Sequence, residues 1–84
     1  MQVQRERRFV DEYLRLTVAE QRQVDRRLLM LEESIRHPSL QARRWRGTEL
    51  WYARVTLDLR MYFEIHEDYY LMIAVGHHDI ERRM

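Results

Sequence analysis

Residues 50–75 run LWYARVTLDLRMYFEIHEDYYLMIAV, and the composition of this stretch decides the fold class. Aromatic and β-branched residues are abundant in it, as they are in strands. Asp58 and the Glu67-Asp68 pair interrupt it with acidic turns. The stretch therefore predicts three consecutive antiparallel strands, at Leu50–Thr56, Leu59–His66 and Tyr69–Val75.

The character of the residues alternates along these predicted strands, and successive side chains of a strand point to opposite faces of a sheet. Odd positions are apolar, namely Trp51, Val55, Leu59, Met61, Phe63, Ile65, Leu71, Ile73 and Val75. Even positions are polar or aromatic, namely Tyr52, Arg54, Arg60, Tyr62, Glu64, His66 and Tyr70. We expect one apolar face, covered by the rest of the chain, and one open polar-aromatic face.

The alternation also predicts the register of the two hairpins. A one-residue slip turns every side chain to the other face, so each hairpin needs an odd number of loop residues. A first hairpin centred on Leu57 gives two pairs, Arg54 with Arg60 and Tyr52 with Tyr62. A second hairpin centred on Glu67 gives two more, Phe63 with Leu71 and Glu64 with Tyr70.

The N-terminal half has helical rather than strand periodicity. Met1–Arg5 alternates weakly and is expected to form a short strand, and Glu6–Leu16 has apolar residues at helical spacing. Thr17 and Glu20 have the spacing of a capping box that begins a second helix. The apolar stripe of this helix is Val24, Leu28, Leu31 and Ile35, and Pro38 is expected to end it.

These elements predict an α+β fold in which an N-terminal helical hairpin packs on an antiparallel sheet of three to four strands. The 84 residues suffice for a single domain over 1–84. Cysteine is absent, and no apolar run approaches the ~18 residues of a membrane span. The N-terminal residues lack the apolar segment of a signal peptide. We therefore expect a cytoplasmic protein without disulfides that does not enter a membrane.

Charge is distributed unevenly along the chain. All 15 basic residues are arginine, and residues 1–46 carry 11 of them against 7 acidic residues. The predicted register adds a local feature, because it places Arg54 directly opposite Arg60 on the open face. Like charges in that arrangement are unfavourable by ~0.2–1 kcal/mol. A bound anion would explain the pair, and ordinary ion pairs with Glu64 and Asp58 are the alternative.

The second half of the chain resembles the RelE/ParE superfamily, toxins of type II toxin–antitoxin systems. The resemblance is carried by Trp51-Tyr-Ala-Arg54-Val55, Leu59-Arg60-Met61-Tyr62-Phe63 and Val75-Gly76-His77-His78, and the preceding helical hairpin fits the same order of elements. It implies an mRNA endonuclease (mRNA interferase) that needs no metal or other cofactor. It also implies mRNA, with or without the ribosome, as target, and a cognate antitoxin as partner.

Matching position by position, the resemblance implies a catalytic role for Arg60 in stabilising the phosphate, with Arg54 in support. His78 falls where RNase members place an acid/base group, and His77 is the alternate. Glu49 is a further candidate, as a general base. A metal site made of His77, His78 and Asp79, with or without His66, is disfavoured because adjacent side chains point apart on extended backbone.

Several further residues are candidates for contacting RNA. Arginines in the segment before the first strand could contact phosphates, and tyrosines on the open face could stack on bases: Arg43, Arg44, Arg46, Tyr52 and Tyr62. A solvated basic loop, and a tyrosine row covered by a partner chain, are the alternatives. An antitoxin would carry acidic and apolar residues to match this surface.

A second function remains open beside the nuclease. ParE-like members of the family share the fold but act on DNA gyrase, and other homologues could bind an antitoxin without catalysis. No tyrosine follows His78 in residues 79–84, although RNase members often have one there, and this favours the alternative. The arginine pair and the two histidines favour the nuclease.

Overall fold

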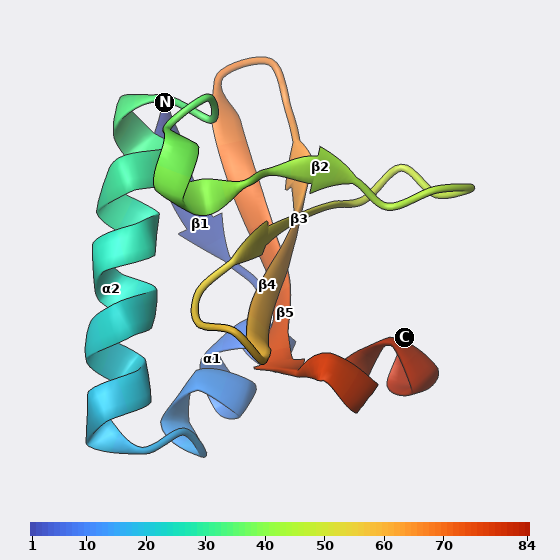
Figure 1. Ribbon diagram of the computed structural model, residues 1–84. Helices are drawn as coiled ribbons and strands as arrows, with labels where there is room; N and C mark the ends of the chain where they lie inside the picture. Colours follow the sequence, from blue (N-terminus) through green and yellow to red (C-terminus); the bar gives the residue numbers. More distant parts are fainter.

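Both α-helices lie on the same side of a five-stranded sheet in the computed structural model, which describes residues 1–84 (Figure 1). The helices are α1 (Arg7–Leu14) and α2 (Val18–Glu33), and two short 3-10 helices follow, η1 (Pro38–Leu40) and η2 (His78–Arg83). The strands are β1 (Gln2–Arg5), β2 (Arg43–Arg44), β3 (Trp51–Arg54), β4 (Leu59–Ile65) and β5 (Tyr69–His77). The α+β class predicted from the sequence is confirmed.

The second helix of the helical hairpin, α2, begins and ends at defined residues. The predicted capping box is present: Thr17 Oγ accepts from the Glu20 N–H at 3.1 Å, and Glu20 Oε1 accepts from the Thr17 N–H at 2.9 Å. The helix ends at Glu33 rather than at Pro38, because Ser34 already takes extended backbone angles. Pro38 instead occupies the first turn of η1, where its missing N–H costs nothing.

The sheet is larger than predicted and mixed rather than antiparallel. Its order is β1-β5-β4-β3-β2, and β1 runs parallel to β5 while the other pairs are antiparallel. The prediction of three to four strands missed β2, which has only two residues and no alternating pattern to reveal it.

The register of the first hairpin is confirmed, with Arg54 opposite Arg60 and Tyr52 opposite Tyr62. The second hairpin was predicted wrongly. Phe63 pairs with Met72 instead of Leu71, and Glu64 pairs with Leu71 instead of Tyr70. Its connection is an even one, because the His66 N–H bonds to the Tyr69 carbonyl and leaves two residues, Glu67 and Asp68, between them.

A bulge at Ile73 follows in β5, because Tyr62 pairs with Ala74 while the next residue, Phe63, pairs with Met72. Together the even connection and the bulge change which residues of β5 face the helices. Tyr70, Met72 and Val75 belong to the main core, whereas Ile73 contacts the cluster on the other face. The predicted placement of Leu71 and Ile73 on the apolar face, and of Tyr70 on the polar face, is therefore wrong.

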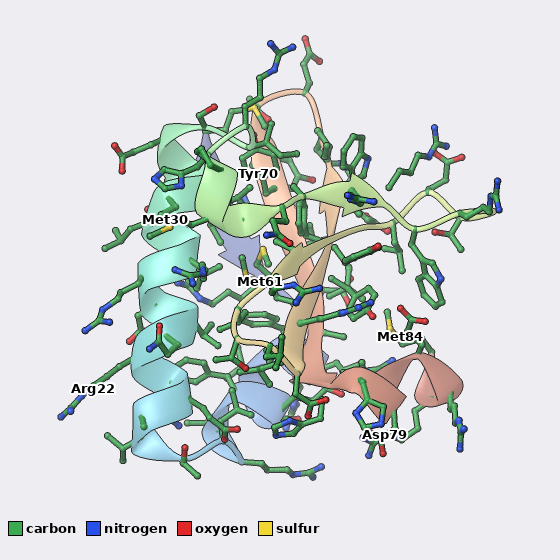
Figure 2. The ribbon with its side chains drawn as sticks, in the orientation of Figure 1. Arg22, Met30, Met61, Tyr70, Asp79 and Met84 are labelled. Carbon is green, nitrogen blue, oxygen red and sulfur yellow. The ribbon has the colours of Figure 1, made fainter.

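Two apolar clusters hold the molecule together, one on each face of the sheet. The main core lies between the helices and the sheet and includes Phe9, Leu31 and Met61, and Figure 2 shows Met61 between α2 and the strands. The smaller cluster consists of Tyr62, Ala74 and Ile80, with Trp45, Tyr52, Ile73 and Met84 against it. The face expected to be open is therefore partly covered, by η2 and by the connection between β2 and β3 (Figure 1).

None of the helices combines the length and the apolarity that crossing a bilayer requires.

Candidate functional site

A basic pocket occupies the uncovered part of the sheet face that points away from the helices. Its volume is about 280 Å³, and its walls come from the end of η1 and from three neighbouring strands: Gln41, Arg43, Tyr52, Arg54 and Arg60. The register explains why these residues meet, because Tyr52 pairs with Arg43 on one side, and Arg54 pairs with Arg60 in the next row. Three guanidinium groups therefore converge on one depression, which we call the arginine pocket.

The two paired arginines have different surroundings. The guanidinium carbon of Arg60 lies 5.0 Å from the centroid of the Tyr52 ring, and its Nη1 lies 3.9 Å from Glu81 Oε2. Arg54 forms no ion pair. The alternative of ion pairs with Glu64 and Asp58 is therefore wrong, because those carboxylates contact His66 and the two C-terminal histidines instead.

Tyr62 lies in β4 opposite Tyr52, a residue of the pocket, and has no exposed surface. Its hydroxyl donates to Glu81 Oε2, and its ring packs against Trp45 at 5.4 Å and Tyr52 at 5.8 Å between centroids. Burial, followed by the bond to the Glu81 carboxylate, raises the pKa of Tyr62 well above its usual range. A side chain without exposed surface cannot stack on a base, so the prediction that Tyr62 contacts RNA directly is wrong for this conformation. Tyr52 is half-buried and lines the pocket.

The C-terminal segment is folded against this face by close packing. Ile80 is 1% exposed and lies directly over Gly76, where a Cβ atom would be 2.7 Å from Ile80 Cδ1. Because Gly76 pairs with Arg60 in the sheet, the segment crosses the strands next to the arginine pocket. This packing positions Glu81, one residue further on, against Tyr62 and Arg60.

His77 and His78 form a second cluster at the end of the sheet. Their Nδ1 atoms each lie 2.6 Å from a different oxygen of the same carboxylate, Asp58, in the turn between β3 and β4. His77 Nε2 also lies 3.1 Å from Glu20 Oε2 at the start of α2. The expectation that adjacent histidine side chains point apart is therefore wrong here, because the backbone leaves β5 at this point and enters η2.

Hydrogen bonds in this cluster stabilise the charged forms of both carboxylates. The bonds from His78 and then His77 lower the pKa of Asp58. The pKa of Glu20 is lowered chiefly by the backbone N–H of Thr17, with His77 contributing less. No group of three or more histidine, aspartate and glutamate side chains is arranged to hold a metal ion.

The structure thus unites some predicted site residues and separates others. Arg54, Arg60, Arg43 and Tyr52 share the arginine pocket, whereas His77 and His78 do not line it. Arg44 forms a 3.3 Å ion pair with Glu49, whose side chain is 93% exposed and is no part of the pocket. Arg46 is exposed in the same connection.

Sequence reasoning did not identify three residues of this region as site residues, namely Gln41, Asp58 and Glu81. Asp58 lies 20 positions before His78, and only the correct register of β4 and β5 brings the two side chains together. Glu81 belongs to a segment with no strand periodicity. Its place depends on how the chain turns back after Gly76, and no local pattern in the sequence signals that turn.

The arginine pocket suits the binding of a phosphate, and the separate histidine cluster has the groups for proton transfer. Guanidinium groups offer paired donors that match phosphate oxygens, and the arginine pocket presents three of them. A carboxylate on Nδ1 orients an imidazole and leaves its Nε2 free to exchange protons, as Asp58 does for His78. Arg60 pairs with Gly76, and His78 follows Gly76 by two residues. Arg60 and His78 therefore belong to the same end of the sheet.

Comparison with known proteins identifies the fold. No protein-family model matches the sequence, and neither does any curated protein. Solved structures do match. The YoeB/ParE toxin from Agrobacterium tumefaciens superposes with a TM-score of 0.79 at 13% identity, covering 93% of this chain and 99% of that one.

Two toxin–antitoxin complexes contain similar chains. In the RelB–RelE antitoxin–toxin complex from Methanococcus jannaschii the TM-score is 0.78 at 12% identity, with 95% of each chain covered. In the intact E. coli RelBE complex it is 0.73 at 18% identity, covering 90% of this chain and 94% of that one. The chain therefore has the fold of the RelE, YoeB and ParE toxins.

Proposed function

We propose that this protein is the toxin of a toxin–antitoxin pair and that it cleaves mRNA without a metal ion. The observation that carries the proposal is the arginine pocket. Arg54 and Arg60 are directly paired there on the adjacent strands β3 and β4, and Arg54 has no acidic partner. A fold needs no such pair of like charges, whereas a phosphodiester would neutralise it. The fold shared with RelE and YoeB toxins points in the same direction.

In the proposed reaction a ribose 2′-hydroxyl attacks the adjacent phosphorus, and the 5′-oxygen of the next nucleotide leaves. The 2′-hydroxyl proton passes to a base, and the leaving oxygen takes up a proton from an acid. Arg60 and Arg54 stabilise the negative charge that grows on the non-bridging oxygens. His78 supplies the proton to the leaving oxygen from its free Nε2, with Asp58 holding the ring, and His77 is held too firmly between two carboxylates to replace it.

The charge of the arginine pocket indicates what kind of protein would inhibit this one. Solved chains of this fold occur with RelB and with DinJ in toxin–antitoxin complexes. An antitoxin for this chain would place acidic side chains against the arginine pocket and so block phosphate binding. Arg44 and Arg46 extend the basic surface beyond the pocket that Arg43 lines, and all three would contact further RNA phosphates or ribosomal RNA.

Primer extension on cellular mRNA after induced expression tests the nuclease. Wild-type protein should produce new 5′ ends, and Arg60→Ala should reduce their yield about 10²- to 10³-fold, the usual cost of losing one donor to transition-state charge. Arg22→Ala is the matched control, because Arg22 is exposed and extends from α2 away from the sheet (Figure 2). Equal loss in both variants would contradict the proposal.

One observation favours a second candidate. His78 does not line the arginine pocket, and this favours a protein that binds without cleaving. Such a protein would inhibit DNA gyrase or only bind an antitoxin. Growth arrest with intact mRNA and halted replication would identify the gyrase inhibitor, and no growth defect at all would identify the antitoxin-binding homologue.

A further inference from the structure

Glu81 is the one carboxylate that contacts an arginine of the pocket. Its Oε2 atom accepts the Tyr62 hydroxyl and lies 3.9 Å from Arg60 Nη1, and the side chains of Arg60 and Glu81 are about one-third exposed, at 31% and 33%. The oxygen-to-nitrogen distance exceeds that of a hydrogen bond, so the contact is electrostatic.

Packing rather than attraction to Arg60 determines where Glu81 lies. Ile80 is buried over Gly76, and the Tyr62 hydroxyl, on a side chain without exposed surface, holds the carboxylate. The other acid nearby in η2, Asp79, faces Arg83 at 3.8 Å instead. The chain thus presents one negative charge to the arginine pocket from a fixed position.

We propose that Glu81 is a built-in counter-ion of Arg60, which a phosphate must displace in order to bind in the arginine pocket. The inference rests on the proposed function in one respect, that the ligand of the pocket is an RNA phosphate. Glu81 lowers the positive potential at Arg60 by pairing with it, while Arg54, which forms no ion pair, keeps its full charge. Glu81 therefore restrains RNA binding and acts through one arginine only.

The test measures binding separately from cleavage. The probe is a fluorescently labelled single-stranded RNA with 2′-O-methyl riboses, which has phosphates but no attacking hydroxyl. Its Kd is measured by anisotropy for wild type and Glu81→Gln. Glutamine keeps an oxygen that accepts the Tyr62 hydroxyl, so the charge is removed with little change in packing.

Glu81→Gln should bind this RNA about three- to fivefold more tightly, since a partly exposed ion pair contributes up to ~1 kcal/mol. The difference should shrink as salt concentration rises, because ions screen exposed charges. Asp79→Asn removes the same charge from the same segment without touching the pocket and should change the Kd much less. In an Arg60→Ala background, Glu81→Gln should have no effect, whereas in Arg54→Ala it should keep its effect.

Three results would overturn the proposal: an unchanged or weaker affinity in Glu81→Gln, an equal gain in Asp79→Asn, or a gain that persists without Arg60. Failure of both wild type and Glu81→Gln to bind the RNA would overturn it as well. Thermal unfolding of each variant separates loss of charge from loss of structure. If the RNA affinities change as expected but cellular mRNA is never cut, the nuclease proposal fails while the proposal that Glu81 is a counter-ion stands.

Discussion

Gly76 offers a direct test of how the C-terminal segment is held against the sheet. A Cβ atom added at this position would lie 2.7 Å from Ile80 Cδ1 and 3.3 Å from both Ile80 Cβ and Cγ1. Rotation of the isoleucine can move Cδ1 away, but it cannot move Cβ, which is fixed to the backbone. Gly76→Ala therefore requires η2 to shift by a few tenths of an ångström. Overpacking of this kind costs typically ~1–3 kcal/mol, and partial relief by rotation places the expected loss in the lower half of that range.

Urea unfolding of four proteins measures this cost: wild type, Gly76→Ala, Ile80→Ala and the double variant. Ile80→Ala alone should lose about 2–5 kcal/mol, because it removes a buried side chain. The double variant should be more stable than the sum of the two losses predicts, by about 1 kcal/mol, since the added methyl group then occupies space that Ile80 has left. Additive losses, or a Gly76→Ala variant as stable as wild type, would refute the packing argument.

The remaining predictions concern the two hydrogen-bonded clusters and the pocket. Bonds from His78 and His77 lower the pKa of Asp58 in the folded state, so its contribution to stability is present above the ordinary carboxyl pKa and is lost as pH falls through the folded value. The free energy of unfolding should therefore fall more steeply between about pH 5 and about pH 1 for wild type than for Asp58→Asn. Parallel curves for the two proteins would contradict this. Thr17→Ala removes the oxygen that caps α2 and should lower the free energy of unfolding by ~1 kcal/mol. Thr48→Ala in the β2–β3 connection is the control, because it leaves α2 capped and should leave the helical circular-dichroism signal unchanged. Tyr62 should resist ionisation in an alkaline spectrophotometric titration, because burial and then the bond to Glu81 raise its pKa, and titration of every tyrosine near the ordinary pKa would contradict the burial of Tyr62.

The sequence predicted the elements that have a strong periodic signal. The capping box of Thr17 and Glu20, the α2 stripe from Val24 to Leu31 and the first hairpin are confirmed, because each depends on residues close together in the chain, whereas Ile35 lies beyond the end of α2. The arginine pair followed from that hairpin. Its neighbours in the pocket did not: β2 is too short for a pattern, and Gln41 reaches the site from the end of η1 through a left-handed backbone conformation at φ 46°.

The error in the second hairpin explains why the contact of Asp58 with His77 and His78 was missed. The predicted register, extended along the strands, would pair Leu59 with Val75, whereas Leu59 pairs with His77. One residue of the difference comes from the even connection at Glu67-Asp68, and the other comes from the bulge at Ile73. Alternation of apolar residues detects neither feature, because Tyr70 and Met72 are as suitable for a core as Leu71 and Ile73 are.

That bulge also accounts for the chemistry at the end of the sheet. Without the extra residue, His77 and His78 would lie one position further along β5 relative to β4, and Asp58 would no longer face both imidazoles. The same shift would take Gly76 away from Arg60, and with it the place where Ile80 crosses the strands and brings Glu81 to the arginine pocket. The two clusters are therefore not independent: a single inserted residue in β5 fixes the position of the histidines relative to Asp58 and of the C-terminal carboxylate relative to the arginines.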